Sequence, residues 1–140
     1  MSTVPGRDPV TAILEAEATG HVAEIFADIR TALQIPMITA IWRMLPDIEG
    51  GLEAAWASTR PIYESGQPDV ALQNLKAQGP FPLPAPLTPG QLESVGVSND
   101  NLPVVRGIVD AYSRSNGMNL IALMALGHGV AQWLYTADRN

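Results

Sequence analysis

The sequence contains no cysteine and only one lysine, Lys76, among its 140 residues. The absence of cysteine excludes disulfide bonds, thiol catalysis and C-x-x-C redox chemistry. The formal net charge is −6, so the chain has no broad positive field, and we expect neither nucleic acid nor an anionic membrane surface as a partner. A local arginine or a few free N–H groups can still bind a small anion, so an anionic ligand stays open.

The sequence also lacks a glycine-rich phosphate loop, a nucleophile elbow and a metal-binding helix motif. Its two histidines, His21 and His128, are far apart and have no cysteine beside them. We therefore expect no metal and no cofactor. His128 stands between two glycines in an apolar run, where a hydrogen-bonded core histidine is the favoured interpretation over a catalytic one.

No basic segment followed by an apolar core is visible at the N-terminus, so the sequence predicts no secretory signal and a cytoplasmic location. The longest apolar run covers residues 117–135 and includes Asn119, His128 and Gln132. These polar side chains would be costly in hydrocarbon. We expect a helix buried in a core or an interface rather than a membrane span.

Hydrophobic residues make up 46% of the chain, and the length fits one domain. We interpret residues 1–19, which hold two prolines and no sustained period, as an arm whose order depends on docking, with a short helix within 11–18. Residues 20–140 are predicted to form a single, compact, all-α multi-helix domain. The segment 79–89 contains five prolines, and we interpret it as an extended strap across the domain or across a partner subunit.

Helical periodicity is clearest in residues 21–34, where apolar residues recur at i, i+3, i+4, i+7 and i+11. Thr19 is the predicted N-cap, and the residue before Pro36 must leave the helical region. A second helix is therefore expected from about Met37 to Leu45. A third, carrying a core Trp56, follows the turn at 47–51 and should kink or end at Pro61.

The C-terminal half predicts four further helices. Asp69 is expected to cap one that runs to about residue 77, and Thr88 to open a capping box with Gln91. The next should begin near residue 102 and stop at Gly117 in a left-handed conformation. The last, residues 119–136, is apolar nearly all round, as in the central helix of a bundle or a dimer interface.

Four polar groups are candidates for chemistry, and each has a simpler explanation. Thr39 and the free N–H groups of the second helix's first turn would suit an anion, but a threonine hydroxyl that bonds back to its own chain is an equally favoured interpretation. Arg43, one turn later, is a candidate carboxylate clamp, although an ordinary ion pair is favoured. Asn116 and Asn119 are candidates for binding a polar ligand, with helix capping favoured. For the pair Glu24 and Asp28, a solvated face is favoured over acid–base chemistry.

Residues 24–56, EIFADIRTALQIPMITAIWRMLPDIEGGLEAAW, resemble the group I 2-haloacid dehalogenases. The shared pattern runs from the IFxDIR helix through Leu33-Gln-Ile-Pro36 and Arg43 to the Gly-Leu and Ala-Trp pairs. A second block, residues 110–126 (DAYSRSNGMNLIALMAL), is similar to the family's aromatic–Asn–x–x–polar–Leu-Leu segment. The wider superfamily includes alkylhydroperoxidase-D-like proteins, whose C-x-x-C activity the absence of cysteine excludes here.

The resemblance implies that two such repeats pack as a pseudo-dimer around one site. This chain has room for one repeat, so the resemblance implies a homodimer. In the family, an aspartate just after the proline that matches Pro36 activates water, and Thr39 stands at the matching position. The implied substrate-binding residues are Met37, Thr39, Ala40, Arg43, Asn116 and Asn119.

Two functions therefore stay open, and the sequence does not decide whether the protein is an enzyme. One is a dehalogenase-like protein that acts on a small (2-halo)carboxylic acid by hydrolytic displacement, with the catalytic residues unknown. The other is a non-catalytic homodimer that binds a small ligand or a partner, because a threonine hydroxyl is a poor general base. A different chemistry that recruits Glu24, Asp28 or His128 is a third alternative.

Overall fold

The computed structural model describes residues 12–79, 82 and 84–137. Every regular element in this part of the chain is helical, which confirms the predicted all-α fold. Residues 1–11 of the expected arm and residues 80, 81 and 83 of the expected strap lie outside the described residues. The elements are η1 (Glu15–Glu17), α1 (Gly20–Leu33), α2 (Ala40–Met44), η2 (Leu45–Asp47), α3 (Gly51–Glu64), α4 (Gln67–Gln78), α5 (Pro89–Ser94) and α6 (Leu102–Ala137).

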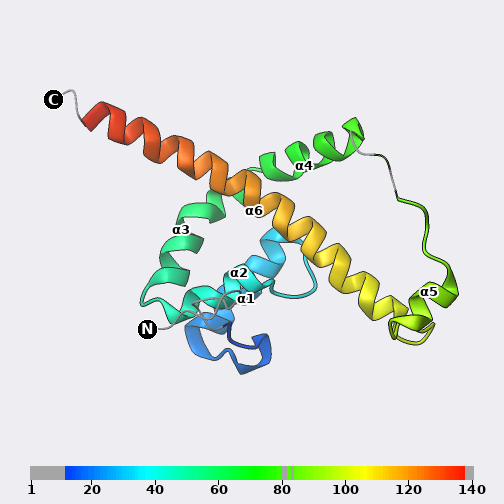
Figure 1. Cartoon of the computed structure of the whole chain (residues 1–140). Helices are drawn as coiled ribbons and strands as arrows, with labels where there is room; N and C mark the ends of the chain where they lie inside the picture. Colours follow the sequence, from blue (N-terminus) through cyan, green and yellow to red (C-terminus); the bar gives the residue numbers. More distant parts are fainter. Residues whose placement is uncertain (1–11, 80–81, 83, 138–140) are drawn as a thin grey trace, which may run out of the picture.

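The long helix α6 is the axis of the molecule (Figure 1). Helices α1, α3 and α4 pack on it, and α1 packs against α3. The C-terminal part of α6 projects past these helices in the same view. In the part of the chain that the structure describes, no helix combines the length and apolarity that a membrane crossing requires.

Helix α1 forms as its periodicity predicts, with Thr19 in the N-cap position. Its buried residues, Ile25, Phe26, Ile29 and Leu33, lie on one face. Gln34 ends the helix in a left-handed conformation with φ of 54°, and its N–H and that of Ile35 donate back to carbonyls of the last turn. Pro36 prevents Ile35 from continuing the helix, so the chain leaves α1 here as predicted.

The second helix begins three residues later than predicted. Residues 35–39, called the elbow from here on, are not helical, and Thr39 is the N-cap of α2 rather than a member of its first turn. Ile35 and Ile38 are buried, which holds this stretch against the core. The five-residue α2 is too short to present the anion-binding first turn that the sequence suggested.

A second prediction is wrong, because no helix ends at Gly117. The helix is continuous from Leu102 to Ala137. Gly117 instead lets α4 approach, since a Cβ atom at this position would lie 2.6 Å from Leu72 Cδ1. The glycine therefore serves close helix packing rather than a helix end.

Helix α3 does not end at Pro61, one of the two outcomes expected there, since Pro61 lies inside the helix, which runs on to Glu64. Its buried face contributes to an aromatic cluster. The rings of Trp42 and Trp56 meet edge to face at 5.6 Å, and those of Trp56 and Tyr63 stack at 5.9 Å. Trp56 is thus a core residue, as predicted, and such ring pairs add about 0.5–1.5 kcal/mol beyond their burial.

The described part of the connection from α4 to α5 lies at the surface. Residues 82 and 84–88 are exposed, and in Figure 1 residues 84–88 run apart from α6 before they reach α5. Asp69 lies in the first turn of α4 rather than at its N-cap, whereas the capping box of Thr88 and Gln91 forms as predicted. A strap across a partner subunit stays a prediction.

The last helix is not buried all round. Ala111, Met118 and Ala122 are buried against the other helices, while Leu120, Leu123 and Met124 are more than half exposed. His128 is also exposed, contrary to the expected core histidine. An apolar face of α6 therefore meets solvent in the single chain.

We expect Gly117→Ala to destabilise the fold by about 1–2 kcal/mol relative to Gly107→Ala, because Leu72 must turn away from the new methyl group. The matched control lies in the same helix, where a Cβ atom meets nothing within 4 Å, so it should stabilise by up to about 1 kcal/mol. Urea unfolding of both variants measures the difference. Equal stability of the two would contradict the close approach of α4 and α6.

Candidate functional site

A chain of four polar side chains crosses the core. Thr39 Oγ1 and Ser115 Oγ lie 2.8 Å apart, and Asn119 Nδ2 donates to Ser115 Oγ at 3.2 Å. Tyr63 donates its hydroxyl proton to Asn119 Oδ1 at 2.7 Å. All four residues are buried, and they come from the elbow, α6 and α3. We call them the polar chain.

The polar chain offers hydrogen bonds but no base. Threonine, serine and asparagine do not ionise near neutral pH, and burial raises the pKa of the Tyr63 hydroxyl well above its usual value of 10.0. A single hydrogen joins the two hydroxyls of Thr39 and Ser115, so one hydroxyl hydrogen of this pair is left to bond elsewhere. The arrangement suits the binding of a polar group better than the removal of a proton.

A partly open cavity of about 140 Å³ adjoins the Tyr63 end of the polar chain. Its volume is close to that of the 150 Å³ engineered cavity that holds benzene. Its lining is mostly apolar and consists of Ile41, Trp42, Leu45, Ala55, Thr59, Tyr63, Asn119, Leu123 and Leu126. No cation lines it, so it fits an uncharged group rather than a carboxylate.

The elbow holds a carboxylate that belongs to the chain itself. Ile38 N–H donates to Glu15 Oε2 at 2.8 Å, and Glu15 Oε1 pairs with Arg30 Nη1 at 2.9 Å. Ile13 N–H donates to the carbonyl oxygen of Arg43, and Arg43 Nη1 donates back to the carbonyl oxygen of Ile13, both at 3.1 Å. Residues 12–18, called the docking segment from here on, therefore contact both Ile38 of the elbow and Arg43 of α2.

Two buried nitrogen donors have no hydrogen-bond partner among the described residues. They are Trp42 Nε1, which belongs to a residue that lines the cavity, and Arg43 Nε, beside the docking segment. A buried donor without a partner is costly, by about 1–3 kcal/mol for a neutral group and more for a charged one. Both are therefore places where an added acceptor would stabilise the protein.

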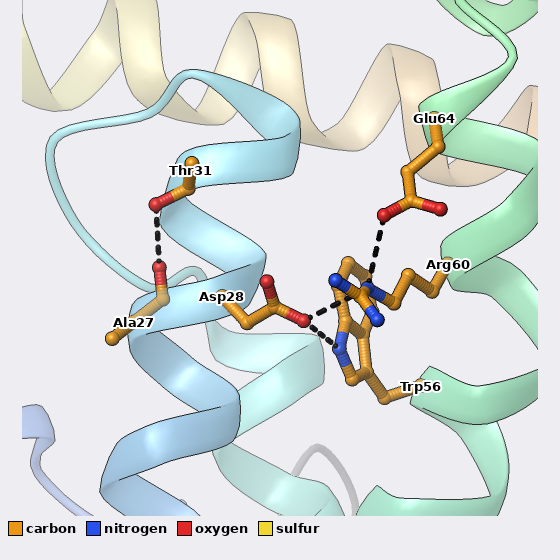
Figure 2. Close-up of polar contacts among 6 residues, drawn as sticks. All are labelled: Ala27, Asp28, Thr31, Trp56, Arg60 and Glu64. Atoms are coloured by element: carbon orange, nitrogen blue, oxygen red, sulfur yellow. Dashed lines mark hydrogen bonds and ion pairs between the residues drawn. The ribbon is translucent and has the colours of Figure 1, made fainter.

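Asp28 has a structural role between α1 and α3, shown in Figure 2. Its Oδ2 accepts from Trp56 Nε1 at 2.8 Å and pairs with Arg60 Nε at 3.0 Å, while Arg60 also pairs with Glu64. Asp28, Glu24 and His21 line one open groove of about 590 Å³, in which Glu24 pairs with His21. Because Asp28 already has two partners, an acid–base role for it is disfavoured.

The predicted site residues do not all meet. Thr39 and Asn119 are joined through Ser115, whereas Arg43 faces the docking segment. Met37 and Ala40 are partly buried on either side of Thr39. Asn116 is exposed on α6 and does not join the polar chain. The described residues contain no group of three or more metal-ligating side chains.

Sequence reasoning missed Ser115, Tyr63, Glu15 and Arg30 as parts of the site. A signal for Ser115 was present, because it lies one helical turn before Asn119 and both share the face of the buried residues Ala111 and Ala122. That face becomes visible only if the helix continues through Gly117. Glu15 carried no comparable signal.

We expect Tyr63→Phe to lower the free energy of unfolding by about 1–3 kcal/mol near neutral pH, because Asn119 Oδ1 loses its partner.

The raised pKa of Tyr63 also makes the stability of the fold depend on pH. Above about pH 10 the unfolded chain releases this proton while the folded protein keeps it, so stability falls as the pH rises. Urea unfolding at pH 7 and pH 10.5 should therefore show a larger loss in the wild type than in Tyr63→Phe. Tyr112→Phe serves as the control, and equal losses in all three proteins would contradict the assignment.

Comparison with known proteins gives one partial match. The chain is 28% identical over 81 residues to an (R)-2-haloacid dehalogenase of Pseudomonas putida. This match covers 54% of the chain and 27% of the relative, so the relative is about twice as long. No protein-family model matches the sequence, and no solved structure matches it. The chain thus has a distant haloacid dehalogenase-like relationship that spans about a quarter of the relative's length.

Proposed function

We propose that the protein is a 2-haloacid dehalogenase-like protein that binds a small organic acid at the elbow. The observation that carries this proposal is the carboxylate of Glu15, which rests on Ile38 N–H and Arg30. A backbone N–H together with a guanidinium group is a strong carboxylate-binding combination. The match to an (R)-2-haloacid dehalogenase supports a small carboxylic acid as the ligand.

Several of the residues first inferred from the family resemblance keep a place in this proposal. Arg43 lies beside the elbow, and its Nε has no partner among the described residues. Thr39 follows Ile38 directly and is the end of the polar chain. Met37 and Ala40 flank Thr39, and Asn119 donates to Ser115 within the polar chain. Asn116 belongs to the proposal only if a partner subunit covers the exposed side of α6.

Binding without turnover is the form of the proposal that the polar chain favours. None of its four side chains supplies a carboxylate or another base at neutral pH. Hydrolytic displacement of a halide needs an activated water, and Thr39 stands where the resemblance places the activating aspartate. We therefore propose that the wild type binds 2-halocarboxylates and releases little or no halide.

A second copy of the chain is the partner that we propose. Leu120, Leu123 and Met124 are exposed at helical spacing on α6. Leu123 also lines the cavity together with Ile41, so the exposed face and the cavity mouth are continuous.

The activity test uses two substitutions of nearly equal size at position 39. In Thr39→Asp, a fully buried carboxylate beside Ser115 would have a raised pKa and would act as a base. We expect it to release halide from 2-chloropropionate about 10²–10⁴ times faster than Thr39→Asn, which perturbs the same site without adding a base. Chloride release from both enantiomers measures the rates.

Two outcomes of this measurement and one of calorimetry would contradict parts of the proposal. Chloride release by the wild type that matches Thr39→Asp would show that another base operates. Equal release by Thr39→Asp and Thr39→Asn would remove position 39 from the chemistry. If calorimetry detects no binding of 2-chloropropionate to the wild type or to either variant, the small-acid proposal is wrong.

The dimer proposal predicts that Leu123→Glu converts a dimer into a monomer, because it places a charge at the centre of the apolar face of α6. Size-exclusion chromatography with light scattering measures the mass. The control is Val95→Glu, which replaces an even more exposed apolar side chain away from this face and should leave the dimer intact. A monomeric wild type would refute the proposal.

A further inference from the structure

Donors from two elements, the elbow and α1, bind the carboxylate of Glu15. Oε2 accepts from the backbone of Ile38, and Oε1 pairs with Arg30 of α1. The contacts are 2.8 and 2.9 Å long, in the range of charge-assisted hydrogen bonds. Each carboxylate oxygen has its own donor, so any free carboxylate of similar shape would find the same two donors.

The docking segment is held to the rest of the chain mostly by polar contacts. None of the three residues of η1 is buried, and Leu14 is 57% exposed. Ile13 and Ala18 are only partly buried against the core. Besides Glu15, the described hydrogen bonds from the segment to the elbow and α2 are the two between Ile13 and Arg43. Few buried apolar contacts are typical of segments that open locally at low cost.

We propose that the elbow is an exchangeable carboxylate site, in which Glu15 competes with a free small carboxylate whose binding releases the docking segment. The inference rests on the proposed function, since it assigns the regulation of the same site. It adds Glu15 as the competitor and Arg30 as a binding residue for the incoming acid.

The two occupants differ in the donors that they use. Glu15 contacts Ile38 and Arg30 but makes no hydrogen bond or ion pair to the guanidinium of Arg43 among the described contacts. Departure of the docking segment frees Arg43 Nη1 from the carbonyl of Ile13, beside an Nε that already lacks a partner. A free acid therefore gains a second cation near the elbow. This differential interaction is what a ligand needs to shift a two-state equilibrium.

Glu15 is covalently linked to the site that it occupies, and this link sets the concentration of free acid at which exchange occurs. A group on a short flexible linker has an effective concentration in the mM range, so a free acid competes only at comparable levels or through extra contacts. The apparent Kd equals the intrinsic Kd divided by the fraction of molecules with an open site. If the site is open about one-tenth of the time, removal of the competitor tightens binding about tenfold.

The test compares the full-length wild type with Glu15→Gln, which removes the charge from the competitor. Glu17→Gln is the matched control, since Glu17 lies on the same segment and, among the described contacts, accepts a hydrogen bond only from Leu14 N–H of that segment. Sodium acetate and sodium 2-chloropropionate are titrated at constant ionic strength against sodium chloride. Calorimetry gives Kd, and the amide NMR signal of Ile38 reports occupation of the elbow.

We expect Glu15→Gln to bind both carboxylates at least about tenfold more tightly than the wild type and Glu17→Gln, with a shift of the Ile38 signal. Glu15→Ala, which removes both contacts, should do the same. Equal affinities in all four proteins, or binding that leaves the Ile38 signal unmoved, would overturn the inference and leave small-acid binding standing. Tighter acetate binding by the Glu15 variants, with no preference for 2-chloropropionate, would support the exchange but remove the haloacid from the proposed function. No binding to any protein would overturn both.

Discussion

The hydrogen bond between the buried hydroxyls of Thr39 and Ser115 is the contact on which the arrangement of the core depends. Buried polar groups are costly unless they are paired. Ser115 also accepts from Asn119 of its own helix, but the Thr39 hydroxyl is paired with Ser115 only if α6 meets the elbow in one register. Asn119 and Tyr63 extend the same requirement to α3. Apolar packing alone tolerates small shifts between helices, whereas four linked polar side chains do not. The polar chain thus fixes how the three elements fit together.

The fold could be predicted from the sequence wherever one strong local signal determined it. The apolar period gave α1, and the capping box gave the start of α5. The errors occurred where tertiary contacts overrode local signals. Gly117 was interpreted as a helix stop, but the need for α4 to approach α6 explains it, and only the position of Leu72 shows this. Pro61, where a kink or an end was expected, does not end α3, and buried residues on both sides of it, Trp56 and Tyr63 among them, pack that helix against the core.

The candidate site was predictable in part, for a related reason. Thr39, Arg43 and Asn119 were visible as polar residues within an apolar pattern, but their partners come from distant parts of the chain. Glu15 lies 23 residues before the N–H that it contacts, in a segment with no sustained period. A carboxylate in such a segment resembles any solvated acidic residue. Its role follows from the position of the elbow, which no local pattern determines.

Position 39 is where the demands of stability and of hydrolysis conflict. A threonine there is fully buried and shares a hydrogen bond with Ser115, and it places no charge in the core. An aspartate at the same place would carry a desolvated charge with only neutral donors beside it. A protein that turns over its ligand must accept that cost, whereas one that only binds an acid at the neighbouring elbow does not. Under the proposed function, the neutral polar chain and the groups beside it that hold Glu15 are therefore what a protein that only binds an acid would retain.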